Sequence, residues 1–191
     1  DTLVIFLSDN GPARTNFKGL PKEWPRGEML GSTNGLRGYK GEYFEGGIRV
    51  PFIVSWPGTI PNNQQIDTPI SSLDIYPTLS ALSGTDLPES EPFEGKNLLP
   101  LLMNETSEMT RDHFLWAGGR VGKNTGAILK DNWKLIINHK GRDFLFNLDN
   151  DPNEKNNLLA NYPNRAADLK SIFDKTLETM PDPLTDRSKL K

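Results

Sequence analysis

Apolar residues in this chain fall into short runs, and the first run is the most compact. Residues 2–7 are apolar or β-branched and end at Ser8-Asp9-Asn10-Gly11, a pattern typical of a strand buried on both faces of a parallel sheet. The next strand-like run, residues 51–56, begins more than forty residues later. A connection of that length is uncommon in a compact domain unless it is functional.

That connection is unusually rich in glycine. Seven glycines fall in the 21 residues from Gly27 to Gly47, so the backbone there can adopt positive φ angles and approach a ligand closely. A flexible linker would also be rich in glycine. The same window carries Leu36, Tyr39, Phe44 and other large apolar residues that linkers lack, so we expect an ordered loop.

Two more apolar segments follow the second strand. Residues 74–84 predict a short helix with Asp74 as a capping carboxylate and Gly84 as the closing residue, and residues 98–102 are apolar on too many sides to be exposed. The polar run 104–108 then separates two differently patterned halves. We therefore expect a change of domain near residues 105–112.

The second half has the pattern of a small α+β domain. Short strand-like runs separated by Gly, Asn and Asp turns predict a four-stranded antiparallel meander at residues 113–117, 127–130, 133–138 and 144–147. Apolar residues at helical spacing from Pro163 to Met180 predict a helix that covers one face of the sheet, and the polar residues 181–191 are expected to fray.

Composition narrows the possible partners. The chain has 191 residues, a net charge of -3 and no cluster of Lys or Arg, which argues against nucleic acid and anionic membranes as partners. Its longest uninterrupted apolar run is far shorter than the roughly 20 residues of a membrane span. The absence of cysteine rules out disulfides and thiolate metal sites without separating cytosol from periplasm.

Three residues are candidates for chemistry. Asp9 and Asn10 offer two hard oxygens for Ca²⁺ or Mg²⁺ at the end of a strand, although Asp-Asn-Gly is also an ordinary turn sequence. Lys40 places an ammonium inside the glycine-rich loop, where it can contact a sulfate or phosphate oxygen, although most lysines are simply solvated.

Other motifs give weaker evidence of a functional site. Asp149-x-Asp151-x-Asn153 begins like an EF-hand loop but has Glu154 at the sixth position, so we interpret it as a turn. The two histidines, His113 and His139, have no metal-ligand companion at i+2 or i+4. Three residues of the glycine-rich loop could contact a leaving group, with surface packing as an equal alternative: Trp24, Arg26 and Glu28.

Several motifs together resemble the type I sulfatases of the alkaline phosphatase superfamily. They begin with Ser8-Asp9-Asn10-Gly11 and continue through Arg37-Gly38-x-Lys40-Gly41 and Glu45-Gly46-Gly47-x-Arg49-Val50-Pro51. Further matches lie at residues 72–78, 94–102, 127–136 and 144–158, the last including Asp151-Pro152-x-Glu154. The resemblance covers nearly the whole chain and implies the C-terminal portion of such an enzyme.

The resemblance implies an α/β fold: residues 1–104 would form the C-terminal part of the catalytic domain, and residues 105–191 an antiparallel-sheet subdomain with a terminal helix. It also implies roles for the candidate residues. Asp9 and Asn10 would ligate Ca²⁺, and Lys40 would contact the substrate sulfate, while Arg-Val-Pro and Asp-Pro-x-Glu would be structural. A hydrated formylglycine would attack sulfur, and the expected substrate is a sulfated carbohydrate or an aryl sulfate ester.

The chain lacks several parts of that family pattern. It has no Cys/Ser-x-Pro-x-Arg, although Ser55-Trp56-Pro57 matches its first three places, and it has no Asp-Asp pair. We therefore expect the formylglycine nucleophile to be absent, Ca²⁺ binding to be weak, and the chain to be inactive without the N-terminal half of the same protein.

Two alternatives to a sulfuric ester hydrolase remain open: a phosphomonoester or phosphonate hydrolase of the same superfamily, and a non-catalytic binding or assembly module. The resemblance also implies a periplasmic or secreted location, although no signal is visible in the sequence. A truncated sheet exposes apolar surface, so self-association is expected.

Overall fold

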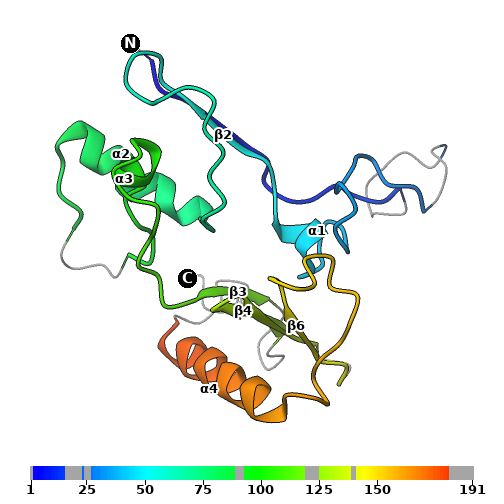
Figure 1. The fold of residues 1–191 in the computed structure, drawn as a ribbon. Coiled ribbons are helices and arrows are strands. Elements are labelled where there is room, and N and C mark those ends of the chain that lie inside the picture. Colours follow the sequence, from blue (N-terminus) through cyan, green and yellow to red (C-terminus); the bar gives the residue numbers. More distant parts are fainter. Residues whose placement is uncertain are drawn as a thin grey trace, which may run out of the picture. The chain divides into compact units, whose positions relative to one another are not determined.

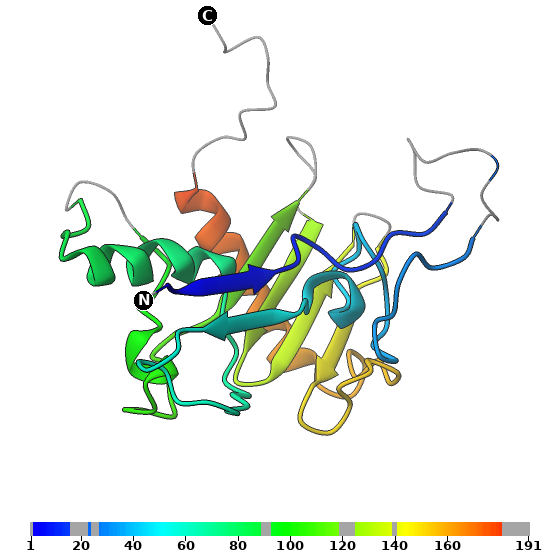
Figure 2. The same ribbon diagram turned by 90° about the horizontal axis from the view of Figure 1, so that it is seen from above.

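The computed structural model describes residues 2–15, 23, 27–88, 93–118, 125–138 and 141–180. Figures 1 and 2 show a mixed α/β chain. In chain order the elements are β1 (Val4–Leu7), α1 (Glu45–Ile48), β2 (Phe52–Ser55), the 3-10 helix η1 (Ser72–Asp74), α2 (Ile75–Ser83), α3 (Leu99–Leu102), β3 (Phe114–Gly118), β4 (Thr125–Lys130), β5 (Trp133–Ile137), β6 (Phe144–Asn147) and α4 (Pro163–Thr179).

The chain forms two compact units. The first contains Asp1–Phe6 and Phe52–Arg111, and the second contains Leu7–Pro51 and Asp112–Lys191. The change of unit at Arg111 lies in the expected range 105–112, but residues 7–51 group with the C-terminal half rather than with the rest of residues 1–104. The division of domains at residue 104 stays a prediction.

In the first unit, the opening strand β1 differs from the prediction in its pairing and its burial. The arrows of β1 and β2 point in opposite directions in Figure 2, so the two paired strands are antiparallel rather than parallel. Burial on both faces is also wrong for this chain, because Val4, Phe6 and Ile53 are 55%, 57% and 60% exposed. The opposite face is covered, since Phe52 and Val54 pack against buried apolar residues of the same unit: Ile60, Leu98 and Leu102.

Helix α2 has the predicted closing residue but a different start. Gly84 adopts a left-handed φ of 67° at its C-terminus, as the sequence predicted. The Asp74 side chain, however, makes no capping hydrogen bond to α2. It is fully buried, accepts hydrogen bonds from the backbone N–H groups of Ser71 and Lys96, and pairs with the Arg111 guanidinium. The carboxylate therefore completes a capping box with Ser71 at the start of η1, which leads into α2, and also fastens two further segments of this unit.

The second unit contains the predicted antiparallel sheet, in the order β3-β4-β5-β6. The β4–β5 hairpin turns at Asp131 and Asn132, whose φ angles of 50° and 59° allow a tight two-residue loop between Lys130 and Trp133. The meander and the turn at Lys130-Asp131-Asn132 were both predicted from the sequence. Strand ends differ from the predicted ones by one or two residues, as is usual for such boundaries.

The two faces of this sheet are covered by different parts of the unit. Helix α4 packs on one face through Ala166, Leu169 and Phe173, which contact apolar residues of β4, β5 and β6. On the other face, Tyr43 and Phe44 of the glycine-rich loop pack against a buried cluster: Ala127, Ile136 and Phe146. Figure 1 shows α1 and α4 on opposite sides of the sheet. Among the described residues, no helix has the length and apolar content to cross a membrane.

Candidate active site

The Ser-Asp-Asn-Gly motif forms a turn directly after β1. Ser8 Oγ donates a hydrogen bond to the backbone oxygen of Asn10 over 2.9 Å, and Asn10 Nδ2 donates one to the Asp9 carboxylate. Asp9 is exposed and Asn10 is half-buried. The two side chains predicted to ligate a metal are therefore accessible and adjacent at the start of the second unit.

The glycine-rich loop is bonded to this turn. The backbone N–H of Gly11 donates to the carbonyl oxygen of Gly47 over 3.0 Å, and that of Lys40 donates to Pro12 over 3.0 Å. A third bond joins the N–H of Ser8 to the Pro51 oxygen over 3.2 Å. The structure thus brings together the two motifs that carry Asp9, Asn10 and Lys40, although these residues are far apart in the sequence.

Close backbone packing at this junction requires glycine. A Cβ atom on Gly11 would lie 1.9 Å from the Gly46 carbonyl oxygen, and one on Gly47 would lie 2.2 Å from the Glu42 oxygen. Both distances are shorter than any real Cβ contact. Gly11 therefore permits the turn to lie against the loop, and Gly47 permits the loop to fold on itself, so neither is merely a flexible point.

A buried charged network holds the same loop to the C-terminal sheet. Lys134 of β5 is fully buried, and its Nζ lies 2.8 Å from Glu45 Oε1 and 2.8 Å from Glu154 Oε1. Glu154 Oε2 accepts a hydrogen bond of 2.7 Å from the backbone N–H of Glu45, the first residue of α1. One ammonium between two carboxylates compensates charges that would be costly to bury alone.

Burial also affects proton binding in this network. Removal from water raises the pKa of the Glu154 carboxyl above its usual value, while the neighbouring Lys134 ammonium and the Glu45 N–H act in the opposite direction. The net effect is a raised pKa. Glu154 therefore holds its proton more tightly in the folded chain than in the unfolded chain.

Arg37 joins the loop to the same sheet by two kinds of contact. Its Nη1 donates a hydrogen bond of 2.7 Å to the backbone oxygen of Glu154. Its guanidinium also lies 4.0 Å from the centre of the Phe44 ring and 5.2 Å from that of Phe144, distances at which a cation is attracted to an aromatic face. Lys40 is thus flanked by two anchored positions, Arg37 and Glu45.

The donors at the turn suit calcium chemically but do not complete a site. Ca²⁺ takes six to eight oxygen ligands, whereas Asp9 and Asn10 supply two adjacent side chains. Within the part of the chain that the structure describes, no group of three or more His, Asp or Glu residues is placed to hold a metal ion. Further oxygen ligands would have to come from elsewhere.

The remaining sequence candidates do not join this site. His113 pairs with Asp112 at the start of β3, and the Glu28 side chain is exposed. His139, Trp24 and Arg26 lie outside the described residues. In the Asp149–Asn153 segment, the Asp151 carboxylate accepts the N–H groups of Lys155 and Asn156, which agrees with the predicted turn.

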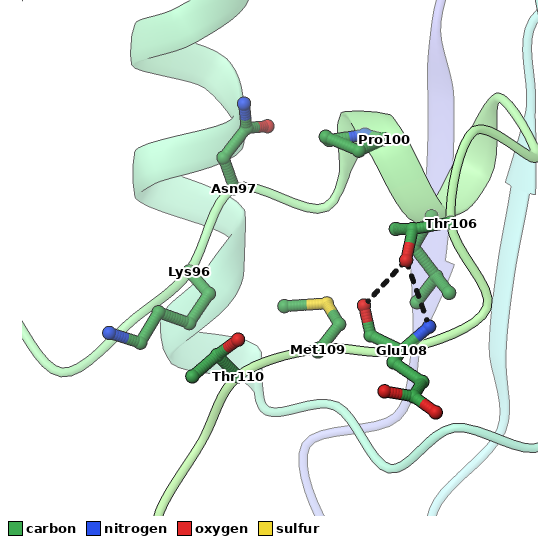
Figure 3. Close-up of a pocket in the computed structure, with 8 residues that line it drawn as sticks. Lys96, Asn97, Pro100, Thr106, Glu108, Met109 and Thr110 are labelled. Atoms are coloured by element: carbon green, nitrogen blue, oxygen red, sulfur yellow. Dashed lines mark hydrogen bonds between the residues drawn. The ribbon is translucent and has the colours of Figure 1, made fainter.

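A pocket is present in the first unit. Figure 3 shows its lining, which includes Lys96, Pro100 and Met109, and its volume is about 310 Å³. Thr106 and Glu108 bond to one another across one wall. The pocket lies in the first unit, whereas Asp9, Asn10 and Lys40 belong to the second unit.

Comparison with known proteins identifies the family. The family described as N-sulphoglucosamine sulphohydrolase, C-terminal, matches residues 39–181. Human steryl-sulfatase is 30% identical over 95% of this chain and 36% of its own length, and N-acetylgalactosamine-6-O-sulfatase of Bacteroides thetaiotaomicron is 30% identical over 91% of this chain and 36% of its own length. The chain therefore spans about a third of the length of these relatives.

Solved structures support the same family. The crystal structure of Ps i-CgsB in complex with k-i-k-neocarrahexaose superposes with a TM-score of 0.70 at 29% identity, covering 91% of this chain and 36% of that one. This protein has the alkaline-phosphatase-like fold of the sulfatases, as its motifs predicted. The chain belongs to the sulfatase family, of which it represents the C-terminal portion.

Proposed function

We propose that this chain supplies one side of the active site of a sulfuric ester hydrolase. The observation that carries the proposal is the pairing of the Ser-Asp-Asn-Gly turn with the glycine-rich loop through the N–H groups of Gly11 and Lys40. This pairing holds on one local framework the backbone segments that carry the proposed calcium ligands, Asp9 and Asn10, and the Lys40 ammonium. A sulfate ester needs both, because its oxygens carry the charge of the transition state.

In the proposed site each residue has a distinct task. Lys40 places its positive charge against a sulfate oxygen, and Asp9 and Asn10 contribute oxygens to a calcium site completed by other parts of the protein. When bound, the calcium would act as a Lewis acid toward the sulfate. The carboxylates of Glu45 and Glu154 share the Lys134 ammonium, and the Arg49 guanidinium lies 3.8 Å from Glu45, which limits their repulsion of the anionic substrate.

The nucleophile must come from elsewhere. Sulfatases of this type use a formylglycine, which supplies the attacking oxygen when hydrated, and the present sequence has neither cysteine nor Ser-x-Pro-x-Arg from which to form it. We propose that these residues act together with a segment carrying that nucleophile, the N-terminal half of the same protein. The exposed apolar face of Val4, Phe6 and Ile53 supports this, since such a face is normally covered.

The relatives suggest the substrate class. One relative is an N-acetylgalactosamine-6-O-sulfatase and one structural neighbour was solved with a carbohydrate ligand, so we propose a sulfated carbohydrate, with an aryl sulfate as a model substrate. We also propose a periplasmic or secreted location, where such carbohydrates occur. The support for it is the same family membership.

The test uses the complete reading frame that contains this chain. We expect the purified protein to hydrolyse 4-nitrophenyl sulfate with a kcat/KM at least about a hundred times that for 4-nitrophenyl phosphate. A reversed preference would favour the phosphoryl or phosphonate alternative. Hydrolysis of neither ester and of no sulfated carbohydrate would favour a non-catalytic binding module.

A further inference from the structure

Glu154 adopts a backbone conformation that glutamate normally avoids. Its φ angle is 55°, in the left-handed region, and it closes a turn in which its N–H donates to the Asp151 oxygen over 3.0 Å. Glycine takes this conformation without steric cost, and Asn or Asp tolerates it better than glutamate does. A strained residue at such a position is retained when its side chain has a task that glycine cannot perform.

The side-chain contacts of Glu154 show what that task is, and its backbone carbonyl adds a contact that any residue at this position could make. The side chain is fully buried, and its Oε2 accepts the backbone N–H of Glu45 over 2.7 Å. The Glu154 carbonyl oxygen accepts Arg37 Nη1, also over 2.7 Å. One residue of the C-terminal turn therefore bonds to the glycine-rich loop three residues before Lys40 and five residues after it.

Lys134 strengthens the same connection. Its ammonium lies 2.8 Å from one carboxylate oxygen of each of Glu45 and Glu154, so it pulls the first residue of α1 toward the turn. The loop in turn bonds to the Ser-Asp-Asn-Gly turn through Lys40 and Gly47. A continuous chain of contacts thus runs from Glu154 to the candidate metal and sulfate ligands.

We propose that Glu154 is a positioning residue, which holds the Lys40 loop in register with the Asp9-Asn10 turn by clamping the loop on both sides of Lys40. The positioning of Lys40 matters to catalysis only if the proposed sulfatase function holds, but the clamp itself is a property of this chain. Glu154 touches neither substrate nor metal in this account.

Two simpler roles make different predictions. If Glu154 only completed its turn, Glu154→Gly would leave the turn and the loop at least as stable, because glycine relieves the strained φ angle. If Glu154 only contributed a buried ion pair to the stability of the whole unit, its loss would weaken the sheet and the loop equally. The clamp predicts that both Glu154→Gln and Glu154→Gly loosen the loop and leave the sheet nearly unchanged.

Amide hydrogen exchange on this chain separates the three roles, with Glu178→Gln on the exposed face of α4 as a matched control. We expect the N–H groups of Gly11, Lys40 and Gly47 to exchange at least about ten times faster in both Glu154 variants, while the amides of β4 and β5 change less than about twofold. Glu178→Gln should change neither set.

Retained protection of the loop in Glu154→Gly would overturn the proposal in favour of the turn role. An equal acceleration in the loop and the sheet, or complete unfolding, would overturn it in favour of general stabilisation. Because exchange requires no sulfate and no turnover, the result stands even if the complete protein hydrolyses no sulfate ester. If the complete protein does hydrolyse a sulfate ester, its kcat/KM should fall about tenfold or more in Glu154→Gln, as expected when a charge in the site is misplaced.

Discussion

The Glu154 carboxylate accepts the backbone N–H of Glu45 at 2.7 Å, although the two residues are 109 positions apart. This bond is one of two direct connections from Glu154 of the C-terminal turn to the glycine-rich loop, the other being made by Arg37. Glu45 carries the first N–H of helix α1, for which no side chain of the preceding residue Phe44 provides a cap. The carboxylate of a distant residue therefore replaces a local cap.

Removing the ammonium at the centre of this network should be strongly destabilising. Lys134→Met leaves the Glu154 carboxylate buried without its counter-charge and leaves Glu45 with only the largely exposed Arg49 guanidinium at 3.8 Å, so we expect the free energy of unfolding to fall by about 3–5 kcal/mol. The matched control is Lys170→Met, which removes a half-exposed pair with Asp174 on α4 and should cost only about 0.5 kcal/mol. Urea denaturation measures both; equal losses would contradict the account.

The raised pKa of Glu154 gives a definite dependence of stability on pH. A carboxyl group with a raised pKa in the folded state contributes most below its usual value of 4.5, and that contribution is lost as the pH rises through the folded pKa. Glu154→Gln lacks this titration. The stability of the parent chain relative to Glu154→Gln should therefore decrease from pH 4.5 toward pH 7 in urea denaturation, and an increase over that range would show that the pKa is lowered instead.

Gly47, where the glycine-rich loop folds closely on itself, is predicted to be indispensable. Gly47→Ala places a methyl group 2.2 Å from the Glu42 carbonyl oxygen and should destabilise the second unit by about 1–3 kcal/mol as the backbone moves. Gly31→Ala meets only the Pro12 side chain at 3.2 Å and should cost less. Thermal unfolding of the two variants compares them directly, and a smaller loss for Gly47→Ala would be inconsistent with the packing described.

In the first unit, Asp74 should matter more than any exposed carboxylate. Asp74→Asn leaves the Arg111 guanidinium without its buried counter-charge and weakens two bonds to backbone N–H groups, so we expect a loss of about 3–5 kcal/mol. The exposed control Asp67→Asn should change stability by less than about 0.5 kcal/mol. Circular dichroism during urea denaturation would reveal either effect, and a near-neutral Asp74→Asn would refute the fastening role.

The sequence predicted local structure better than it predicted contacts between distant segments. Strand β6 was predicted correctly from a short apolar run between turn residues, and the start of α4 at Pro163 from a helical pattern, because both signals are local. The pairing of the Asp9 and Lys40 motifs was implied only by the family resemblance. The antiparallel pairing of β1 and β2 was missed, because an apolar run does not reveal the direction of its neighbour.

The buried network was missed for the same reason. Lys134 interrupts an otherwise apolar strand, and Glu154 stands where an EF-hand loop would have glycine, so each left a signal in the sequence. Neither signal identifies a partner, since the ion pair between Lys134 and Glu45 joins residues 89 positions apart. A lone charge in an apolar strand is ordinarily interpreted as solvent-facing, and only the folded structure shows that it is compensated.

The most direct test of the account concerns Lys40 itself. In the complete protein that contains this chain, Lys40→Met should lower kcat/KM for 4-nitrophenyl sulfate by at least about a hundredfold, because the ammonium stabilises charge on the sulfate oxygens. Lys175→Met, on the exposed surface of α4, should leave the rate unchanged. Hydrolysis by Lys40→Met at the rate of the parent protein would contradict the assignment of the glycine-rich loop to the active site.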